Sequence, residues 1–469
     1  MRQNENRREF VKKSTAIAAF GAGLWTKNST ILAVGGTGVK ADQQNEEKTS
    51  QGSKYRKISS PQWLREATMC NCLSEGSHKP PNSIGLVEGI PFLMDANEKS
   101  VIESIHKKGF RGLAYVRFMD TAIKCWGKID PPPVNPNRPP SRVPFSTDWA
   151  DILLMDEEGR FVNTVMSNCY RLNRYLVCAN SKTYVKKALE LVTQIMDMGV
   201  DGFFVDNVKW RRDCFGHGLR VGYSEGDGMI AERPGRRKYK PIKERLEKLP
   251  LHTHIYPDKD HNYAFRQLLL QVRDLVKSYS KDNIVILNGA LSPFADCGDG
   301  VMIESHICSW AWEGRNKTWA QLKQLAEKYE PFLAAGGQVV ACSYLGEKTT
   351  KHTVKDDAYF CCAASRVSGF IWTDYLTISD NPAKILYKAH LGELKTPMLA
   401  SGRIDYRICR RGIVAVNGDK IAHTATIHLP SDVNFKTLRD LYNEKTLPVH
   451  NDILQITIPA ESGRVYQAI

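Results

Sequence analysis

Short apolar, β-branched runs alternate with amphipathic stretches between residues 62 and 398. Seven of the runs predict strands, over residues 112–118, 175–178, 202–207, 284–288, 301–305, 338–344 and 370–374. We expect the first strand upstream, between residues 67 and 89, where residues 67–73 and 83–89 are competing candidates. The intervening stretches repeat apolar residues every three or four positions, as in 185–196 and 265–276, which predicts helices packed on a sheet.

Continuous apolar strands that alternate with helices are buried on both faces, which is typical of a parallel sheet. Eight such units in roughly 330 residues favour an α/β fold of the (β/α)8 TIM-barrel type over an open doubly wound sheet. Past residue 400 the pattern changes to a period of two, in short runs separated by Asn-Gly, Pro-Ser and Asn-Glu turns. We therefore expect a barrel catalytic domain over residues 62–398 and a small C-terminal antiparallel β-sandwich over residues 399–469.

The first 41 residues resemble a twin-arginine export signal. Arg7 and Arg8 open a basic segment, and the mildly apolar stretch from Thr15 to Trp25 that follows is too short to span a bilayer. The resemblance implies that the bacterial twin-arginine translocase exports the chain to the periplasm or the cell exterior. Cleavage before Asp42, earlier cleavage and a retained anchor are the alternatives. Residues 42–61 are polar and aperiodic, so we expect a disordered linker there.

The whole chain has 65 basic and 51 acidic residues, a net charge of +14. Residues 1–41 hold seven basic and two acidic residues, so their removal leaves +14 − 5 = +9. Much of the remaining excess lies between Lys209 and Lys248, directly after a predicted strand. This basic insertion is either a solvated surface segment or a feature that attracts an anionic glycan. Nucleic acid is not an expected partner, because no nucleic-acid-binding module is recognisable. A membrane span is not expected either, because no apolar run is long enough.

Twelve cysteines are present, without a Cys-x-x-Cys motif and without a Cys and His pair at zinc-finger spacing. We therefore do not expect a structural metal site. Cys178, Cys342 and Cys361 lie inside apolar runs, where free buried thiols are expected. A twin-arginine substrate folds in the reducing cytoplasm before export, so we expect few disulfides.

Polar side chains follow most of the predicted strands, at the carboxyl ends where barrels of this kind carry their active sites. They are Arg117, Asp120, Asn180, Asp206, Asn207, Asn288, Glu304, His306, Tyr344 and Asp374. Each has a structural alternative: Asp206 also suits a helix cap, and Glu304 also suits an ion pair with Arg117 or Lys209. As a set around one crevice, these residues favour a functional site.

Residues 178–207 are similar to a pattern that recurs in glycoside hydrolase barrels of the alpha-amylase-like and alpha-galactosidase-like superfamily. A Cys-x-Asn-Ser helix start is followed by a helix, by Gly-Val-Asp-Gly-Phe-Phe and by an Asp that closes the fourth strand. Residues 301–306, Val-Met-Ile-Glu-Ser-His, resemble the sixth strand of the same barrels with its acid. The C-terminal residues resemble the small all-β domain that follows such barrels.

The resemblance implies an enzyme that cleaves glycosidic bonds of a poly- or oligosaccharide without a cofactor. Asp206 would be the nucleophile and Glu304 the general acid/base, with a pKa raised by partial burial. Their strands are expected nearly opposite each other across the barrel mouth. The other strand-end polar residues would bind sugar hydroxyls, and Trp310, Trp312 and Tyr344 would offer flat apolar faces to the sugar ring.

Two other functions stay open. A non-catalytic carbohydrate-binding barrel of the cell envelope would use the same carboxylates to hold hydroxyls. A metal-dependent hydrolase or lyase on the same barrel is disfavoured, because the one His-x-His, at His252 and His254, lies in the basic insertion and not at a strand end beside the acids.

Overall fold

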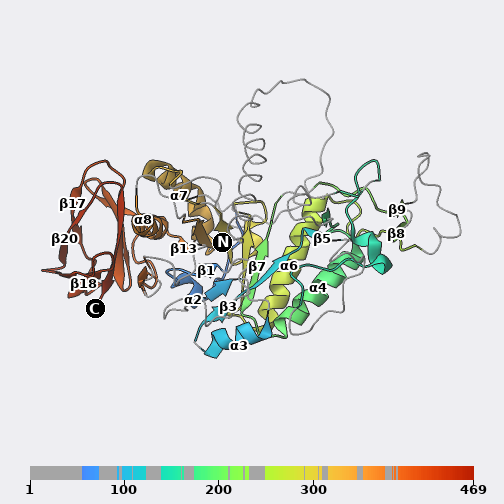
Figure 1. Ribbon diagram of the computed structural model, residues 1–469, viewed down its shortest axis with the longest axis horizontal. Coiled ribbons are helices and arrows are strands. Elements are labelled where there is room, and N and C mark those ends of the chain that lie inside the picture. The colour runs from blue at the N-terminus through green and yellow to red at the C-terminus, as the bar shows by residue number, and fades with distance from the viewer. Residues whose placement is uncertain are drawn as a thin grey trace, which may run out of the picture. The chain divides into compact units, whose positions relative to one another are not determined.

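A central sheet of parallel strands carries the candidate residues. The computed structural model describes residues 55–72, 92–94, 98–107, 109–122, 139–159, 161–162, 174–209, 212–224, 228–231, 249–289, 291–304, 306–308, 315–345, 352–374, 383, 385–386 and 389–469. Six strands pair in the order β13–β12–β11–β10–β7–β4, all parallel (Figure 1). They are β4 (Ala114–Arg117), β7 (Gly202–Asp206), β10 (Ile284–Asn288), β11 (Gly300–Ile303), β12 (Gln338–Ser343) and β13 (Ile371–Asp374).

Three shorter parallel strands form a second sheet, and its two outer strands adjoin the two outer strands of the central sheet. They pair in the order β1 (Asn71–Cys72), β2 (Phe92–Met94) and β3 (Arg111–Gly112). Only Leu113 separates β3 from β4 along the chain, and Met69, just before β1, forms a parallel bridge with Trp372 of β13. The backbone N–H of Cys70 also donates to the carbonyl of Trp372 at 3.0 Å. β1 therefore lies within the first candidate stretch, residues 67–73, while residues 83–89 fall outside the described part.

The strand predicted over residues 175–178 is not part of the central sheet. Strand β6 (Arg174–Leu176) pairs antiparallel with β5 (Asp120–Ala122), and β4 pairs directly with β7. Val177 bridges Leu153 and both are fully buried, so local packing accounts for the apolar run without a place in the parallel sheet. Strand β2 takes a place between β1 and β3 that the apolar pattern did not predict.

Helices cover one face of the central sheet. The longer ones are α3 (Lys99–Lys107), α4 (Lys182–Met196), α6 (His261–Tyr279), α7 (Trp319–Ala334) and α8 (Val354–Val367), with the short α2 (Gln62–Arg65), η2 (Thr147–Ile152) and η4 (Ala295–Cys297) between. α4 and α6 lie side by side next to β7 (Figure 1). Most of the apolar residues on their predicted faces are buried, and Leu189 and Leu275 are partly buried. Ser181 and Asp260 cap the two helices by accepting from the N–H of Tyr184 and Tyr263. No helix in the described ranges has the length and apolarity needed to cross a membrane.

Alternate residues of each strand belong to two different apolar cores. Tyr115, Phe204, Ile286 and Met302 share one core, and Val116, Phe203, Val205 and Leu287 share the other with the helices. Burial on both faces is what a parallel sheet requires. Side chains two positions apart on a strand lie on the same face. The residues two positions after Tyr115, Phe204, Ile286 and Met302 therefore lie on the same face of the sheet as these four, beyond the end of their core; they are Arg117, Asp206, Asn288 and Glu304.

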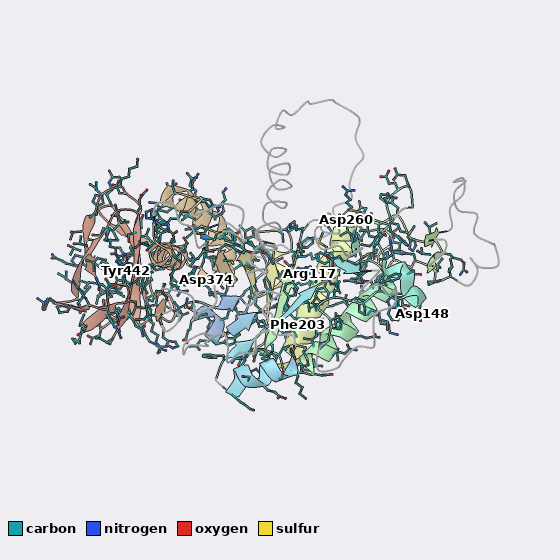
Figure 2. The ribbon with its side chains drawn as sticks, viewed as in Figure 1. Arg117, Asp148, Phe203, Asp260, Asp374 and Tyr442 are labelled. Atoms are coloured by element: carbon teal, nitrogen blue, oxygen red, sulfur yellow. The ribbon has the colours of Figure 1, made fainter. Side chains whose placement is uncertain are left out.

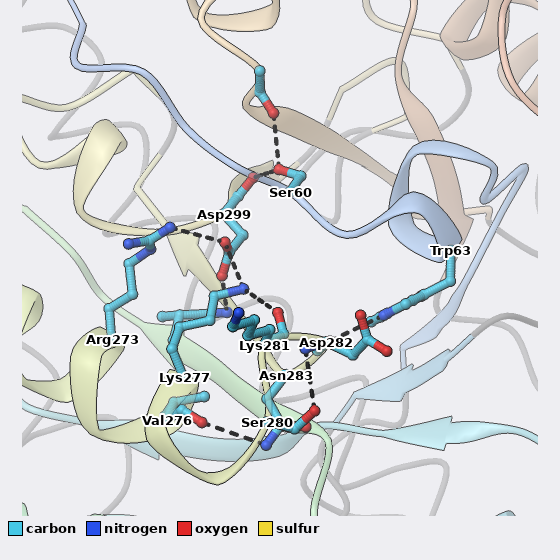
Figure 3. Close-up of polar contacts among 12 residues, drawn as sticks. Ser60, Trp63, Arg273, Val276, Lys277, Ser280, Lys281, Asp282, Asn283 and Asp299 are labelled. Carbon is cyan, nitrogen blue, oxygen red and sulfur yellow. Dashed lines mark hydrogen bonds and ion pairs between the residues drawn. The ribbon is translucent and has the colours of Figure 1, made fainter.

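A buried carboxylate ties the amino end of the sheet together (Figure 3). Asp299, which directly precedes β11, is fully buried and forms ion pairs with Arg273 at 3.3 Å and Lys277 at 3.0 Å. Its Oδ2 accepts from the backbone N–H of Val285 at 2.9 Å, and its carbonyl accepts from the Ser60 hydroxyl at 3.0 Å. These contacts hold the amino ends of β10 and β11 to α6 and to the segment before α2.

Residues 399–469 form antiparallel strands. Six pair in the order β14 (Leu399–Ser401), β15 (Ile404–Cys409), β16 (Gly412–Asn417), β21 (Ser462–Ala468), β18 (Thr437–Asp440) and β19 (Thr446–Pro448). β17 (His423–His428) pairs with β20 (Ile453–Ile458), and both groups contribute to one apolar core. Helix α8 packs against β16 and β21 as well as β13, and a Cβ at Gly463 would come within 2.7 Å of the Ala363 side chain, so close packing requires glycine there. A further hairpin, β8 (Val221–Ser224) and β9 (Gly228–Ala231), lies in the basic insertion.

Candidate functional site

Asp206, the last residue of β7, accepts five hydrogen bonds. Its Oδ1 accepts from the backbone N–H of Asn207 at 2.8 Å and from Asn288 Nδ2 at 2.7 Å. Its Oδ2 accepts from the Tyr115 hydroxyl at 2.6 Å, from Arg117 Nε at 3.0 Å and from Asn207 Nδ2 at 2.7 Å. All five partners donate, as a carboxylate requires, and they hold the group in one orientation. The side chain is 12% exposed, so part of it reaches solvent.

Strand β4 supplies the basic and phenolic partners of this carboxylate. The sheet register pairs β4 with β7 and places Arg117 opposite Asp206. Figure 2 labels Arg117 of β4 and Phe203 of β7. Arg117 Nε also donates to the Tyr115 hydroxyl, and its guanidinium carbon lies 5.0 Å from the centre of the Tyr115 ring. Tyr115 and Arg117 are two positions apart, so both project to the face that carries Asp206.

The backbone turns sharply directly after Asp206. Asn207 has a φ of 60°, in the left-handed region that Asn tolerates better than most residues with a Cβ. In this conformation both its backbone N–H and its side-chain amide donate to Asp206. The next residue, Val208, donates its N–H to the carbonyl of Asn288 at 2.8 Å, which joins the ends of β7 and β10. The left-handed turn therefore sets the position of the carboxylate.

Glu304 follows β11 and lies two strands from Asp206, with β10 between them. Asn288, at the end of β10, donates to Asp206 and lies near enough to Glu304 to lower its pKa. The Tyr344 hydroxyl, one residue beyond β12, donates to Glu304 Oε1 at 3.3 Å. The two acids therefore stand at the ends of strands that only β10 separates. The sequence had led us to expect them nearly opposite each other across the barrel mouth.

The pKa of Glu304 is raised above that of an ordinary glutamate. The main cause is that surrounding protein atoms displace water, which disfavours the ionised form, and the second is the negative charge of Asp206. The Tyr344 hydroxyl, the Asn288 amide and the positive charge of Lys209 lower the pKa of Glu304. The side chain itself reaches solvent. The environment thus favours an accessible carboxyl group that keeps its proton to a higher pH than usual.

Several of the sequence-predicted residues have contacts outside this cluster. Asp120 is buried on β5 and pairs with Arg142 at 3.1 Å. Asn180 holds the backbone of Tyr256, accepting from its N–H and donating to its carbonyl, both at 2.8 Å.

His306 and Asp374 are fully buried. Burial and the charge of Lys317 lower the pKa of His306 to about 3, so its imidazole is neutral at physiological pH, and it packs against Phe370 with ring centres 5.5 Å apart. Asp374 ends β13 opposite Ser343 (Figure 2). Trp310 and Trp312 lie outside the described residues.

Two contributors to the site were not among the predicted site residues. Tyr115 was counted only as part of an apolar strand, and Lys209 only as an ion-pair partner for Glu304. The period of two from Tyr115 to Arg117 was the available signal for the first, because it places the hydroxyl on the same face as the arginine. Lys209 is close enough to lower the pKa of Glu304. The residues that the fold brings together around the two acids are Tyr115, Arg117, Asp206, Asn207, Asn288, Glu304 and Tyr344.

No family model matches the chain, and no curated protein matches it. Solved structures of glycoside hydrolases are similar to it. A cyclomaltodextrinase has a TM-score of 0.49 and 11% identity, covering 87% of this chain and 79% of its own. A GH27 β-L-arabinopyranosidase from Geobacillus stearothermophilus in complex with arabinose has a TM-score of 0.47 and 10% identity, covering 87% and 99%. An alpha-amylase from Geobacillus thermoleovorans complexed with acarbose has a TM-score of 0.46 and 9% identity, covering 87% and 99%.

Proposed function

We propose that this chain is an exported glycoside hydrolase in which Asp206 is the nucleophile and Glu304 the general acid/base. The observation that carries the proposal is the placement of the two carboxyl groups at the ends of β7 and β11, where the negative charge of Asp206 acts on Glu304. Hydrolysis of a glycosidic bond commonly needs two carboxyl groups on either side of the bond, one ionised and one protonated. The pairing with Arg117 suits the ionised role of Asp206, and the raised pKa suits the protonated role of Glu304.

The two acids lie close to each other. Only β10 separates their strands, and the negative charge of Asp206 raises the pKa of Glu304. Retaining enzymes hold their carboxyl groups about 5 to 5.5 Å apart, and inverting ones about 6.5 to 9.5 Å. A short separation suits retention of configuration, which is what we propose.

In the first step, Glu304 gives its proton to the glycosidic oxygen as that oxygen leaves the anomeric carbon. Asp206 supplies the electron pair for a new bond to the same carbon, which forms a glycosyl ester. In the second step, the Glu304 carboxylate takes a proton from water, and the resulting hydroxide equivalent displaces Asp206. Glu304 ends protonated and Asp206 ionised, so the cycle is balanced without a cofactor. Once Asp206 is part of the ester it carries no negative charge, and this loss lowers the pKa of Glu304. The lower pKa suits the change of Glu304 from acid to base.

The substrate we propose is a poly- or oligosaccharide. Arg117, Asn207, Asn288 and Tyr344 surround the two acids with the donors that sugar hydroxyls need. Lys209 opens the basic insertion and lies near Glu304, which supports an anionic glycan as the substrate class. Most of the remaining basic residues of that insertion lie outside the described ranges.

We also propose that the strands close into a (β/α)8 barrel. The pairings run from β1 through β2 to β3, continue through β4, β7, β10, β11 and β12 to β13, and return through the Met69–Trp372 bridge. This assignment has eight strands if β3 and β4 are one strand, and it makes β7 the fourth and β11 the sixth. The shared core of the C-terminal strands supports a sandwich over residues 399–469. Residues 1–41 as a twin-arginine signal and a periplasmic or extracellular location belong to the same proposal.

The test is the release of reducing ends from a panel of neutral, uronic-acid and sulfated glycans by the purified chain. On any glycan that is cleaved, Asp206→Asn should lose several orders of magnitude in kcat while the chain remains folded, as circular dichroism at the assay temperature can verify. Tyr344→Phe is the matched control, since it removes one hydroxyl near Glu304 and should cost about tenfold or less. Undiminished turnover by Asp206→Asn would exclude the nucleophile role.

The alternative is a non-catalytic carbohydrate-binding barrel of the cell envelope. The observation that favours it is the number of hydrogen bonds to Asp206, because five donors already occupy a carboxylate that would have to attack a substrate. A binder would show saturable affinity for a glycan in calorimetry without any release of reducing ends. An enzyme would show both on the same glycan.

A further inference from the structure

Two cysteines and two histidines from three separate segments converge outside the acid cluster. Cys178 follows β6, Cys214 follows β7, and His252 and His254 precede α6. One ligand atom from each residue lies within 4.8 Å of those of the other three. Cys178, His252 and His254 are buried and Cys214 is partly buried. The nine cysteines whose side chains the structure describes are all free thiols, so these two are available as ligands.

The spacing of these atoms matches a tetrahedral metal site. Cys178 Sγ lies 3.6 Å from His254 Nε2, and Cys214 Sγ lies 3.5 Å from His252 Nε2. Around a tetrahedral zinc ion, with Zn–S of about 2.3 Å and Zn–N of about 2.0 to 2.1 Å, a sulfur and a nitrogen ligand stand about 3.6 Å apart. Each histidine thus presents the same nitrogen, at ligand spacing, to a different sulfur.

One nitrogen of His252 remains for a group outside the metal cluster. His252 Nδ1 is buried and has no hydrogen-bond partner among the described residues. A histidine that binds a metal through one nitrogen usually donates the other N–H to a carboxylate or carbonyl. Metal binding through Nε2 would fix the proton on Nδ1, and Asp151, whose charge interacts with that of His252, is a carboxylate in the same region.

We propose that Cys178, Cys214, His252 and His254 bind a structural zinc ion. Four protein ligands fill a tetrahedral shell and leave no position for water or substrate, which is the arrangement of structural and not catalytic zinc. Two cysteines with two histidines favour zinc over harder ions such as magnesium and calcium, which prefer oxygen ligands. The proposal does not depend on the chain being a glycosidase.

The placement of the ligands indicates what the ion would stabilise. Cys214 lies eight residues after Asp206, and His254 lies seven residues before His261, which begins α6. The ion would therefore join the two ends of the long connection between β7 and α6. Through Cys178 it would also join them to the residues just before α4. His217 supports the same geometry from within the connection, because its Nδ1 accepts from the backbone N–H of His254 at 3.0 Å. The basic insertion would thus be held in place beside the acids.

The experiment is metal analysis of the full chain, purified without chelator after expression in zinc-supplemented medium and dialysed exhaustively. We expect about one zinc per chain. Cys214→Ser and His252→Gln should each retain less than about a tenth of that amount. His428→Gln is the matched control, since it removes an exposed imidazole at the end of β17, and should keep the full amount. X-ray absorption should show two sulfurs at about 2.3 Å and two nitrogens at about 2.0 to 2.1 Å.

A measurement on the unaltered chain keeps the proposal testable if the variants do not fold. Cys178 and Cys214 should resist alkylation in the zinc-loaded chain and react together after a chelator is added, while Cys361 stays unreactive in both states. Less than about a tenth of a zinc per chain after loading, a disulfide between Cys178 and Cys214 in the freshly purified protein, or unchanged zinc in both ligand variants would each overturn the proposal.

Discussion

The pairing of Arg117 with Asp206 yields a prediction that needs no substrate. Their side chains are 8% and 12% exposed and meet at 3.0 Å, so replacing Arg117 by Met leaves a nearly buried carboxylate without its counter-ion. Breaking a buried pair in this way costs about 3 to 5 kcal/mol. Asp206 keeps its donors from Tyr115, Asn207 and Asn288, which places the expected loss near the lower end, at about 3 kcal/mol.

The two charges must be tested together as well as singly. In the double variant with Asp206→Asn no unpaired charge remains, so its loss in unfolding free energy should be smaller than the sum of the single losses by at least about 1 kcal/mol. Urea unfolding followed by tryptophan fluorescence measures all four proteins of the cycle. Lys395→Met is the control, because it breaks an exposed pair with Asp432 and should cost about 0.5 kcal/mol or less. Additive losses, or an Arg117→Met loss as small as that of the control, would refute the reasoning.

Three further predictions follow from named contacts. Glu304→Gln should stabilise the chain at neutral pH, because the folded-state pKa of Glu304 is raised and its ionised form therefore opposes folding above the unfolded pKa; in thermal unfolding from pH 8 to 4 the gain should vanish below about pH 4.3. Gly289→Ala would put a Cβ within 2.0 Å of the Val208 carbonyl, so it should lower the unfolding free energy by about 1 to 3 kcal/mol and turnover by about a hundredfold. Its control is Gly199→Ala, which has a φ of +87° and open space around the new Cβ. This control should lower the unfolding free energy by about 1 kcal/mol and leave turnover unchanged. Asp299→Asn should lower the unfolding free energy by about 2 to 4 kcal/mol without changing the KM of the remaining folded enzyme; a changed KM would contradict its separation from the site.

The hydrophobic pattern predicted most of the sheet because each central strand buries both faces. It failed where an apolar run is buried by local contacts, as with Val177 against Leu153, and where a strand is very short, as with Phe92–Met94. A run of three apolar residues carries no periodicity, so nothing distinguishes it from a buried loop.

The same pattern located both acids but not all of their partners. Asp206 and Glu304 were evident because a carboxylate stands out at the end of an apolar strand. Asn180 was equally evident, yet it holds the backbone of Tyr256. Tyr115 was hidden because a tyrosine within a strand is usually part of the core.

The sequence showed only part of the proposed zinc site. His252 and His254 stood out as the one His-x-His, but Cys178 and Cys214 are 36 positions apart, and His252 follows after another 38. Helix α4 and strand β7 lie between the two cysteines along the chain, so only the folded chain shows that the four atoms meet. The sequence therefore led us to expect no metal site, because it was searched for the short spacings of zinc fingers.

The paired-acid mechanism is tested most directly by the covalent intermediate. Glu304→Gln should still form the glycosyl ester from an aryl glycoside whose leaving group needs no proton, but should hydrolyse it slowly. Rapid quenching and peptide mapping by mass spectrometry should then find one glycosyl unit on the peptide that contains Asp206. A glycosyl unit on another residue, or turnover of the aryl glycoside without any adduct and with inversion at the anomeric carbon, would contradict the mechanism.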